Sequence, residues 1–147
     1  IFVLIFFGPI AVGGTYYVQT LEMNNIVIIA GFAPGLFSVA ILTVNNLRDL
    51  KNDMTAGKKT LAVRFGVNFS RMEYLFSIII ACLIPFMLFV FYHVHPFSSL
   101  TMLVVLTALP SVKKVFTTEG KILNDVLAAT GRLLLLYSLI FSVGWVL

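Results

Sequence analysis

The sequence predicts an all-α membrane protein built as a bundle of transmembrane helices. Of its 147 residues, 60% are hydrophobic and only 11% are charged, and most of the charges lie between long apolar stretches. Soluble domains are about half apolar and about a quarter charged, so an ordinary soluble domain is excluded. A transmembrane barrel would show alternating segments of about ten residues, whereas these stretches are continuously apolar.

Five apolar stretches are candidate membrane spans, because a hydrocarbon core about 30 Å thick takes about 20 helical residues. They run roughly over residues 1–20, 25–44, 74–92, 97–112 and 131–147. In the second stretch, Gly31 and Gly35 are spaced for close helix contact, and Pro34 can kink the helix. Residue 1 is an Ile already inside an apolar stretch. We therefore expect residues 1–147 to be the C-terminal part of a single transmembrane domain in a longer chain.

The distribution of Lys and Arg predicts how the spans are oriented. If successive connections alternate between two sides, all ten Lys and Arg residues lie on one side or enter a span from it. Connections 21–24 and 93–96, on the opposite side, carry none. Positive charge marks the cytoplasmic side, so residues 45–64 are expected to face the cytoplasm. The formal net charge of +4 then reflects topology and contact with a lipid bilayer, and we expect no nucleic-acid partner.

Residues 45–64, here called the charged segment, are the most informative part of the chain. They hold two of the six acidic residues and five of the ten basic ones. At about 3 kcal/mol for each charged side chain at a bilayer centre, burying them in lipid would cost on the order of 20 kcal/mol. The segment is therefore predicted to lie at the membrane surface or in a polar cavity.

Oxygen-bearing side chains recur every four residues at the start of the charged segment. If the helix of the second stretch continues, Asn45, Asp49 and Asp53 share one face. Asn46 lies beside that face, one turn before Asp49. Carboxylate and amide oxygens suit Mg²⁺, which completes its shell with water and substrate phosphates. We therefore expect these side chains to bind Mg²⁺.

Basic side chains surround this row and are suited to phosphate oxygens. They are Arg48, Lys51, Lys58, Lys59 and Arg64. Acidic groups that hold a metal, next to basic groups that hold an anion, indicate a complex of diphosphate with Mg²⁺. The alternative is a solvated loop whose charges set the topology and pair with one another.

Two further groups of polar residues lie near the ends of spans. His93 and His95 on the outer turn could bind a transition metal, but a plain loop is favoured because no other ligand accompanies them. Asn124 and Asp125 lie on the predicted cytoplasmic side, where Asp125 could cap the last helix.

The run NNLRDLKNDMTAGKKTLAVRFG, residues 45–66, resembles the second aspartate-rich motif of the UbiA-type membrane prenyltransferases. Segments 6–17 and 123–133 resemble the same family, so the resemblance covers nearly the whole chain. The residues of this motif are most similar to those of the menaquinone branch of the family. One departure is Asp125, where the family pattern leads us to expect Pro.

The resemblance implies a nine-helix transmembrane fold, of which these would be the last five helices. It also implies two aspartate-rich motifs that face each other across a cavity, the first of which is absent from this sequence. Asp49 and Asp53 match the second motif and would be the catalytic residues that carry Mg²⁺. Lys58, Lys59 and Arg64 match basic positions and, with Arg48, are candidate ligands of the substrate diphosphate.

The activity implied by the resemblance is transfer of a polyprenyl group from polyprenyl diphosphate to 1,4-dihydroxy-2-naphthoate, with loss of diphosphate and CO₂. The expected location is a bacterial inner membrane, with the site facing the cytoplasm. One alternative is a sibling enzyme that uses 4-hydroxybenzoate or haem as acceptor. Another is a non-enzymatic transporter, which would place ionisable residues deep within its spans, whereas here they are confined to loops and span ends.

Overall fold

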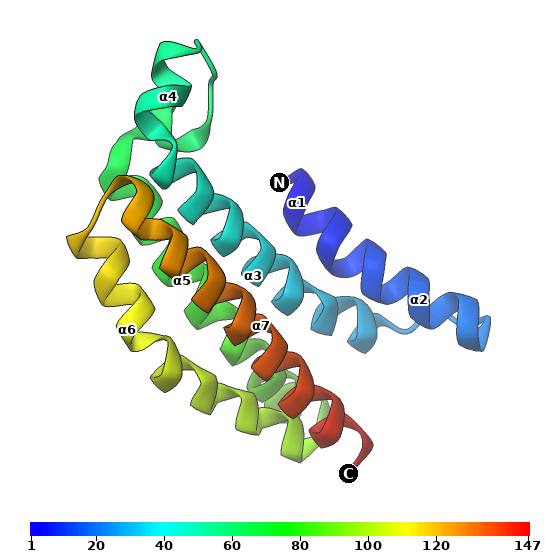
Figure 1. Ribbon diagram of the computed structural model, residues 1–147. Coiled ribbons are helices and arrows are strands. Elements are labelled where there is room, and N and C mark those ends of the chain that lie inside the picture. Colours follow the sequence, from blue (N-terminus) through cyan, green and yellow to red (C-terminus); the bar gives the residue numbers. More distant parts are fainter.

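The computed structural model describes residues 1–147 and is entirely helical (Figure 1). Its elements are α1 (Phe2–Ile5), η1 (Phe6–Ile10), α2 (Ala11–Thr20), α3 (Asn25–Arg48), α4 (Leu50–Thr55), α5 (Leu61–Tyr92), η2 (Pro96–Leu103), α6 (Val104–Thr117), η3 (Gly120–Ile122) and α7 (Leu123–Val146). Five helical segments are long and apolar enough to cross a membrane: Phe2–Thr20, Asn25–Arg48, Leu61–Tyr92, Pro96–Thr117 and Gly120–Val146. The predicted fold class of this integral membrane protein is confirmed.

Most of the helices are longer than the apolar stretches from which they were predicted. The extra turns lie at the end of the bundle that carries the charged segment. The third span starts at Leu61 and not at residue 74, and the last starts at Gly120 and not at residue 131. Hydropathy marks where a helix leaves hydrocarbon, whereas a helix continues as long as its backbone hydrogen bonds do. α5 begins where the Thr60 hydroxyl accepts a hydrogen bond from the N–H of Val63 at 3.3 Å. It bends at Gly66, whose φ of 84° favours glycine.

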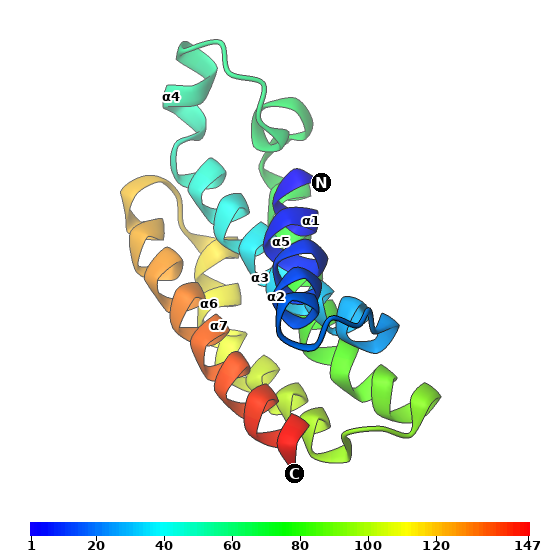
Figure 2. The same ribbon diagram turned by 90° about the vertical axis from the view of Figure 1, so that its right-hand side faces the viewer.

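The core lies between α3, α5, α6 and α7, which pack as a bundle (Figures 1 and 2). Its largest fully buried side chains include Phe37, Tyr74 and Tyr137. The hydroxyls of Tyr74 on α5 and Thr130 on α7 are hydrogen bonded at 3.0 Å. Small residues such as Ala33 and Ala40 face the same core, which lets the helices approach closely.

The segment from α1 to α2 packs along the α3 side of the bundle and not within it (Figure 1). Glycines make this contact possible. A Cβ atom on Gly35 would lie 2.5 Å from the carbonyl oxygen of Leu4, and one on Gly8 would lie 2.8 Å from that of Gly31. The predicted close contact at Gly31 and Gly35 is confirmed, and its partners include Leu4 of α1 and Gly8 of η1. α3 itself continues through Pro34 without interruption.

The charged segment lies at one end of this bundle. α4 projects beyond the end of α3, and the connection between α6 and α7 lies at the same end (Figure 1). Another connection, between α5 and η2, contains His93 and His95, both with positive φ. The His95 ring stacks on Trp145 with 3.7 Å between ring centroids.

Candidate functional site

The backbone changes direction at Asp49. α3 ends at Arg48, and Asp49 has φ −95° and ψ 6°, outside the helical region, before α4 starts at Leu50. Helical hydrogen bonds nevertheless continue across the break, from Asp49 N–H to the Asn45 carbonyl at 3.1 Å and from Asp53 N–H to the Asp49 carbonyl at 2.9 Å. The two aspartates therefore stay one turn apart, but the single uninterrupted helical row expected from their spacing is broken between them.

Arg48 joins the first part of the row into one cluster. Its Nε donates to Asp49 Oδ1 at 2.9 Å, and its NH2 group donates to Asp49 Oδ2 at 2.5 Å. The same NH2 group donates to Asn45 Oδ1 at 2.7 Å. Hydrogen bonding from Arg48, aided by attraction to Lys58, holds the pKa of Asp49 below its ordinary value, although desolvation opposes the shift.

Asp53 belongs to a second pair. Its carboxylate is buried, with 6% of the side chain exposed, whereas its partner Lys58 is 65% exposed. Lys58 Nζ donates to Asp53 Oδ1 at 2.8 Å. The hydrogen bond to Asp53 and the attraction of that carboxylate raise the pKa of Lys58, and Asp49 contributes in the same direction. Lys58 thus interacts chiefly with Asp53 and more weakly with Asp49.

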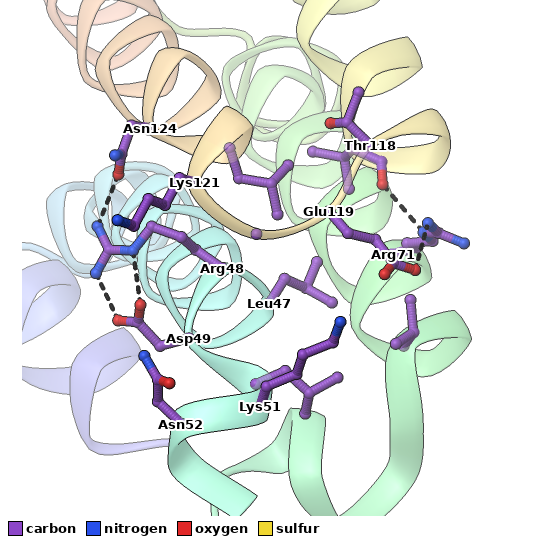
Figure 3. A pocket seen from close by; sticks show the side chains of 15 residues that line it. Leu47, Arg48, Asp49, Lys51, Asn52, Arg71, Thr118, Glu119, Lys121 and Asn124 are labelled. Atoms are coloured by element: carbon purple, nitrogen blue, oxygen red, sulfur yellow. Dashed lines mark hydrogen bonds and ion pairs between the residues drawn. The ribbon is translucent and has the colours of Figure 1, made fainter.

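A pocket of about 420 Å³ opens beside Asp49, between the end of α3, the start of α4, α5 and the connection from α6 to α7 (Figure 3). Its charged lining residues are Arg48, Asp49, Lys51, Arg71, Glu119 and Lys121. Arg48 pairs with Asp49, and Arg71 lies 4.0 Å from Glu119. Lys51 and Lys121 have no ion-pair partner, so the pocket carries a surplus of positive charge.

Arg71 braces one wall of this pocket. Its Nε donates to the carbonyl oxygen of Val115 in the last turn of α6 at 3.0 Å. Such carbonyls have no partner within their own helix, so the contact fixes the end of α6 against α5. The following residues Thr118, Glu119 and Lys121 are thereby held at the rim (Figure 3).

The structure brings some predicted site residues together and leaves others apart. Asn45, Arg48 and Asp49 form one cluster, and Asp53 forms a pair with Lys58. Lys59 and Arg64 are exposed and line none of the main pockets. The predicted metal ligand Asn46 is partly buried, and its side chain makes no hydrogen bond to the cluster or to the pair.

Sequence reasoning treated Arg71 and Lys121 only as markers of topology and missed their place in the pocket. It also missed Glu73, whose Oε2 accepts a hydrogen bond from Thr43 Oγ1 at 2.9 Å, and which has no cation partner within 4.0 Å. Glu73 was hidden because the third span was started at Tyr74, whereas α5 already includes it. A lone acidic residue inside an apolar helix would have been the signal.

The oxygen atoms near Asp49 can be compared with what Mg²⁺ requires. Both Asp49 oxygens and Asn45 Oδ1 already converge on one cation, the Arg48 guanidinium, so this donor set suits positive charge. No three His, Cys, Asp or Glu side chains come together as a metal cluster. One carboxylate and one amide still fit Mg²⁺, because this ion usually binds through one or two carboxylates together with waters and substrate phosphates.

The fold and the pocket define a polytopic membrane protein with a charged, anion-attracting site at one end of an apolar bundle. Residues 1–121 match the model of the UbiA prenyltransferase family. The chain therefore belongs to the UbiA prenyltransferase family. No solved structure matches it.

Several curated relatives are similar to this chain. A 1,4-dihydroxy-2-naphthoate octaprenyltransferase of Haemophilus influenzae is 36% identical over 97% of this chain and 46% of its own length. The Escherichia coli protein of the same name is 44% identical over 44% of this chain and 21% of its own. Mouse UbiA prenyltransferase domain-containing protein 1 is 30% identical over 99% of this chain and 42% of its own. The chain thus spans less than half the length of these relatives.

Proposed function

We propose that this chain forms part of the active site of an Mg²⁺-dependent polyprenyltransferase. The enzyme would transfer a polyprenyl group from polyprenyl diphosphate to 1,4-dihydroxy-2-naphthoate, in menaquinone biosynthesis. The observation that carries the proposal is the cluster of Asn45, Arg48 and Asp49 on a pocket with surplus positive charge, at the end of an apolar bundle. Family membership and the names of the relatives support it.

In this proposal the acidic and amide oxygens of the charged segment hold the metal. Asp49 and Asn45 are the central ligands, with Asp53 and Asn46 as the further members of the set. When bound, Mg²⁺ supplies Lewis-acid stabilisation of the negative charge that develops on the departing diphosphate. An aspartate carboxyl is ionised near neutral pH even at its ordinary pKa, and contact with Arg48 lowers the pKa of Asp49 further, so its carboxylate is able to bind a cation.

Basic residues would bind the diphosphate itself. Lys58, Lys59 and Arg64 follow Asp53 in the charged segment, and Lys51 and Lys121 add unpaired ammonium groups at the pocket. As the allylic C–O bond breaks, both of its electrons move to the bridging oxygen of diphosphate. Fixed cations stabilise that charge without having to reorganise at the moment of reaction.

The apolar helices would serve the other half of the reaction. They offer a lipid-like path to the polyprenyl chain and exclude water, which would otherwise capture the allylic cation. The ring carbon that bears the carboxylate of the acceptor then bonds to the allylic carbon. Its bond to the carboxylate breaks, CO₂ leaves, and the electron pair returns to the ring, so that no other reactant is needed.

The proposal is tested with the complete protein in detergent or vesicles. It is incubated with a polyprenyl diphosphate, with and without Mg²⁺, and with 1,4-dihydroxy-2-naphthoate, 4-hydroxybenzoate or haem as acceptor. Product from the naphthoate that depends on Mg²⁺ would support the proposal. Product from 4-hydroxybenzoate or haem alone would favour a sibling enzyme, and no product from any acceptor would favour a non-enzymatic role.

A further inference from the structure

We propose that Arg48 and Asn124 are positioning residues for the metal-binding oxygens of Asn45 and Asp49, and that Arg48 is not a diphosphate ligand. The inference rests on the proposed function, since it assigns roles within that metal site. It gives Arg48 a different role from Lys58, Lys59 and Arg64, together with which it was predicted from the sequence to bind diphosphate.

The hydrogen bonds of Arg48 leave few of its N–H donors available to a substrate. A guanidinium has five N–H donors, and four of them already reach protein oxygens on Asn45, Asp49 and Asn124. The contact with Asp49 is a two-point contact with both carboxylate oxygens, which fixes the plane of the carboxylate as well as its position. Only one N–H is left over, whereas the neighbouring ammonium groups of Lys51 and Lys121 are unpaired.

Asn124 anchors this guanidinium to a different part of the bundle. Its Oδ1 accepts a hydrogen bond from Arg48 NH1 at 3.0 Å, across 76 positions of sequence (Figure 3). Asn124 lies in the first turn of α7, between Leu123 and Val126, which are 1% and 0% exposed in the core. The Asn124 side chain therefore starts from a backbone that packing holds in place.

The backbone at Asp49 explains why such an anchor is useful. The backbone changes direction there, although helical hydrogen bonds continue on both sides, so the axis of α3 alone does not set the direction of the carboxylate. Arg48 connects it through hydrogen bonds to Asn45 on α3 and to Asn124 on α7, and thereby links both candidate ligands to a second helix of the bundle. Each carboxylate oxygen has a second lone pair, so Arg48 and a metal can contact Asp49 together.

The test measures metal affinity directly, by Mn²⁺ titration of the complete protein without substrate, with free Mn²⁺ followed by electron paramagnetic resonance. Partners that orient metal ligands typically contribute 10–100-fold in affinity. We expect Asn124→Ala to weaken Mn²⁺ binding by about tenfold or more, and Asn124→Asp, which keeps the acceptor oxygen, to restore it. Asp125→Asn is the matched control in the same turn, where only a 3.8 Å pair with Lys114 is lost.

Arg48→Lys separates positioning from diphosphate binding, because lysine keeps the charge but lacks the planar group that contacts both Asp49 oxygens at once. We expect it to weaken Mn²⁺ binding about as much as Asn124→Ala does, and the double variant to lose no more than either single one. Unchanged Mn²⁺ affinity in Arg48→Lys with a raised KM for polyprenyl diphosphate would overturn the proposal. So would additive losses in the double variant.

These outcomes are separate from those that test the proposed function. Prenyl transfer by the unmodified protein together with unchanged Mn²⁺ affinity in Asn124→Ala would refute the positioning role alone. Absence of Mn²⁺ binding and of prenyl transfer in the unmodified protein would refute both. Thermal unfolding of every variant is measured in parallel, and a Tm as low in Asn124→Asp as in Asn124→Ala, with equally weak Mn²⁺ binding, would point to a merely structural role and contradict the inference.

Discussion

The buried carboxylate of Asp53 and the exposed ammonium of Lys58 lie 2.8 Å apart and form the ion pair that closes α4 onto the chain that follows it. A buried carboxylate is costly unless it is paired and hydrogen bonded. The Lys58 side chain is 65% exposed, so a substrate anion could also attract its ammonium group. The pair therefore couples the stability of this end of the bundle to the charge state of Lys58.

The stability contributed by this pair should depend on pH in one direction. The pKa of Lys58 is raised above its ordinary value of 10.5 in the folded protein, so the contribution is complete below that value and is lost as pH rises through the raised pKa. Lys58→Met should lower Tm at neutral pH, and the difference from the unmodified protein should shrink only above about pH 10.5. Lys59→Met is the matched control, because Lys59 is exposed and forms no ion pair. Equal effects of both variants would contradict the account.

Loss of either aspartate should nearly abolish prenyl transfer. We expect Asp49→Asn and Asp53→Asn to lower kcat/KM by at least about 100-fold, since even the outer partners of metal ligands contribute 10–100-fold. The measurement is Mg²⁺-dependent transfer by the complete protein in detergent, with thermal unfolding as a check on folding. Full activity in either variant would remove that residue as a metal ligand.

The contact of α1 and η1 with α3 should not tolerate a methyl group at Gly35. The added Cβ would lie 2.5 Å from a backbone oxygen and 3.0 Å from the Gly8 Cα, neither of which can move without shifting a helix. Gly35→Ala should destabilise the protein by about 1–3 kcal/mol, the usual cost of overpacking. Gly14→Ala on α2 is the control, because its Cβ would meet nothing within 4 Å. Comparable Tm values for the two variants would show that this contact is looser than described.

Most of the fold could be predicted from the sequence, because uninterrupted apolar stretches of about 20 residues have few alternatives to membrane-spanning helices. The residues at which the helices begin and end could not be predicted in the same way. Hydropathy falls at Arg64 and Arg71, yet α5 includes both, since Thr60 caps it well before the apolar residues begin. That error placed Glu73 outside a span and hid its contact with Thr43.

The candidate site was predictable in its composition but not in its contacts. The four-residue spacing placed Asp49 and Asp53 one turn apart, as the backbone hydrogen bonds have them. Spacing could not reveal that Asp53 is buried or that Arg48 reaches Asn124 on α7, because both depend on how distant parts of the chain pack. The same holds for Arg71, whose partner is a backbone carbonyl on α6.

An acceptor competition with the complete protein tests the proposed prenyl transfer to the naphthoate. Polyprenyl diphosphate and Mg²⁺ are supplied with equal amounts of 1,4-dihydroxy-2-naphthoate and 4-hydroxybenzoate, and the prenylated products, CO₂ and diphosphate are quantified. We expect a prenylated product from the naphthoate, with one CO₂ and one diphosphate released for each product molecule, and no product when Mg²⁺ is removed. Product from 4-hydroxybenzoate alone, or transfer that is independent of Mg²⁺, would contradict this proposal.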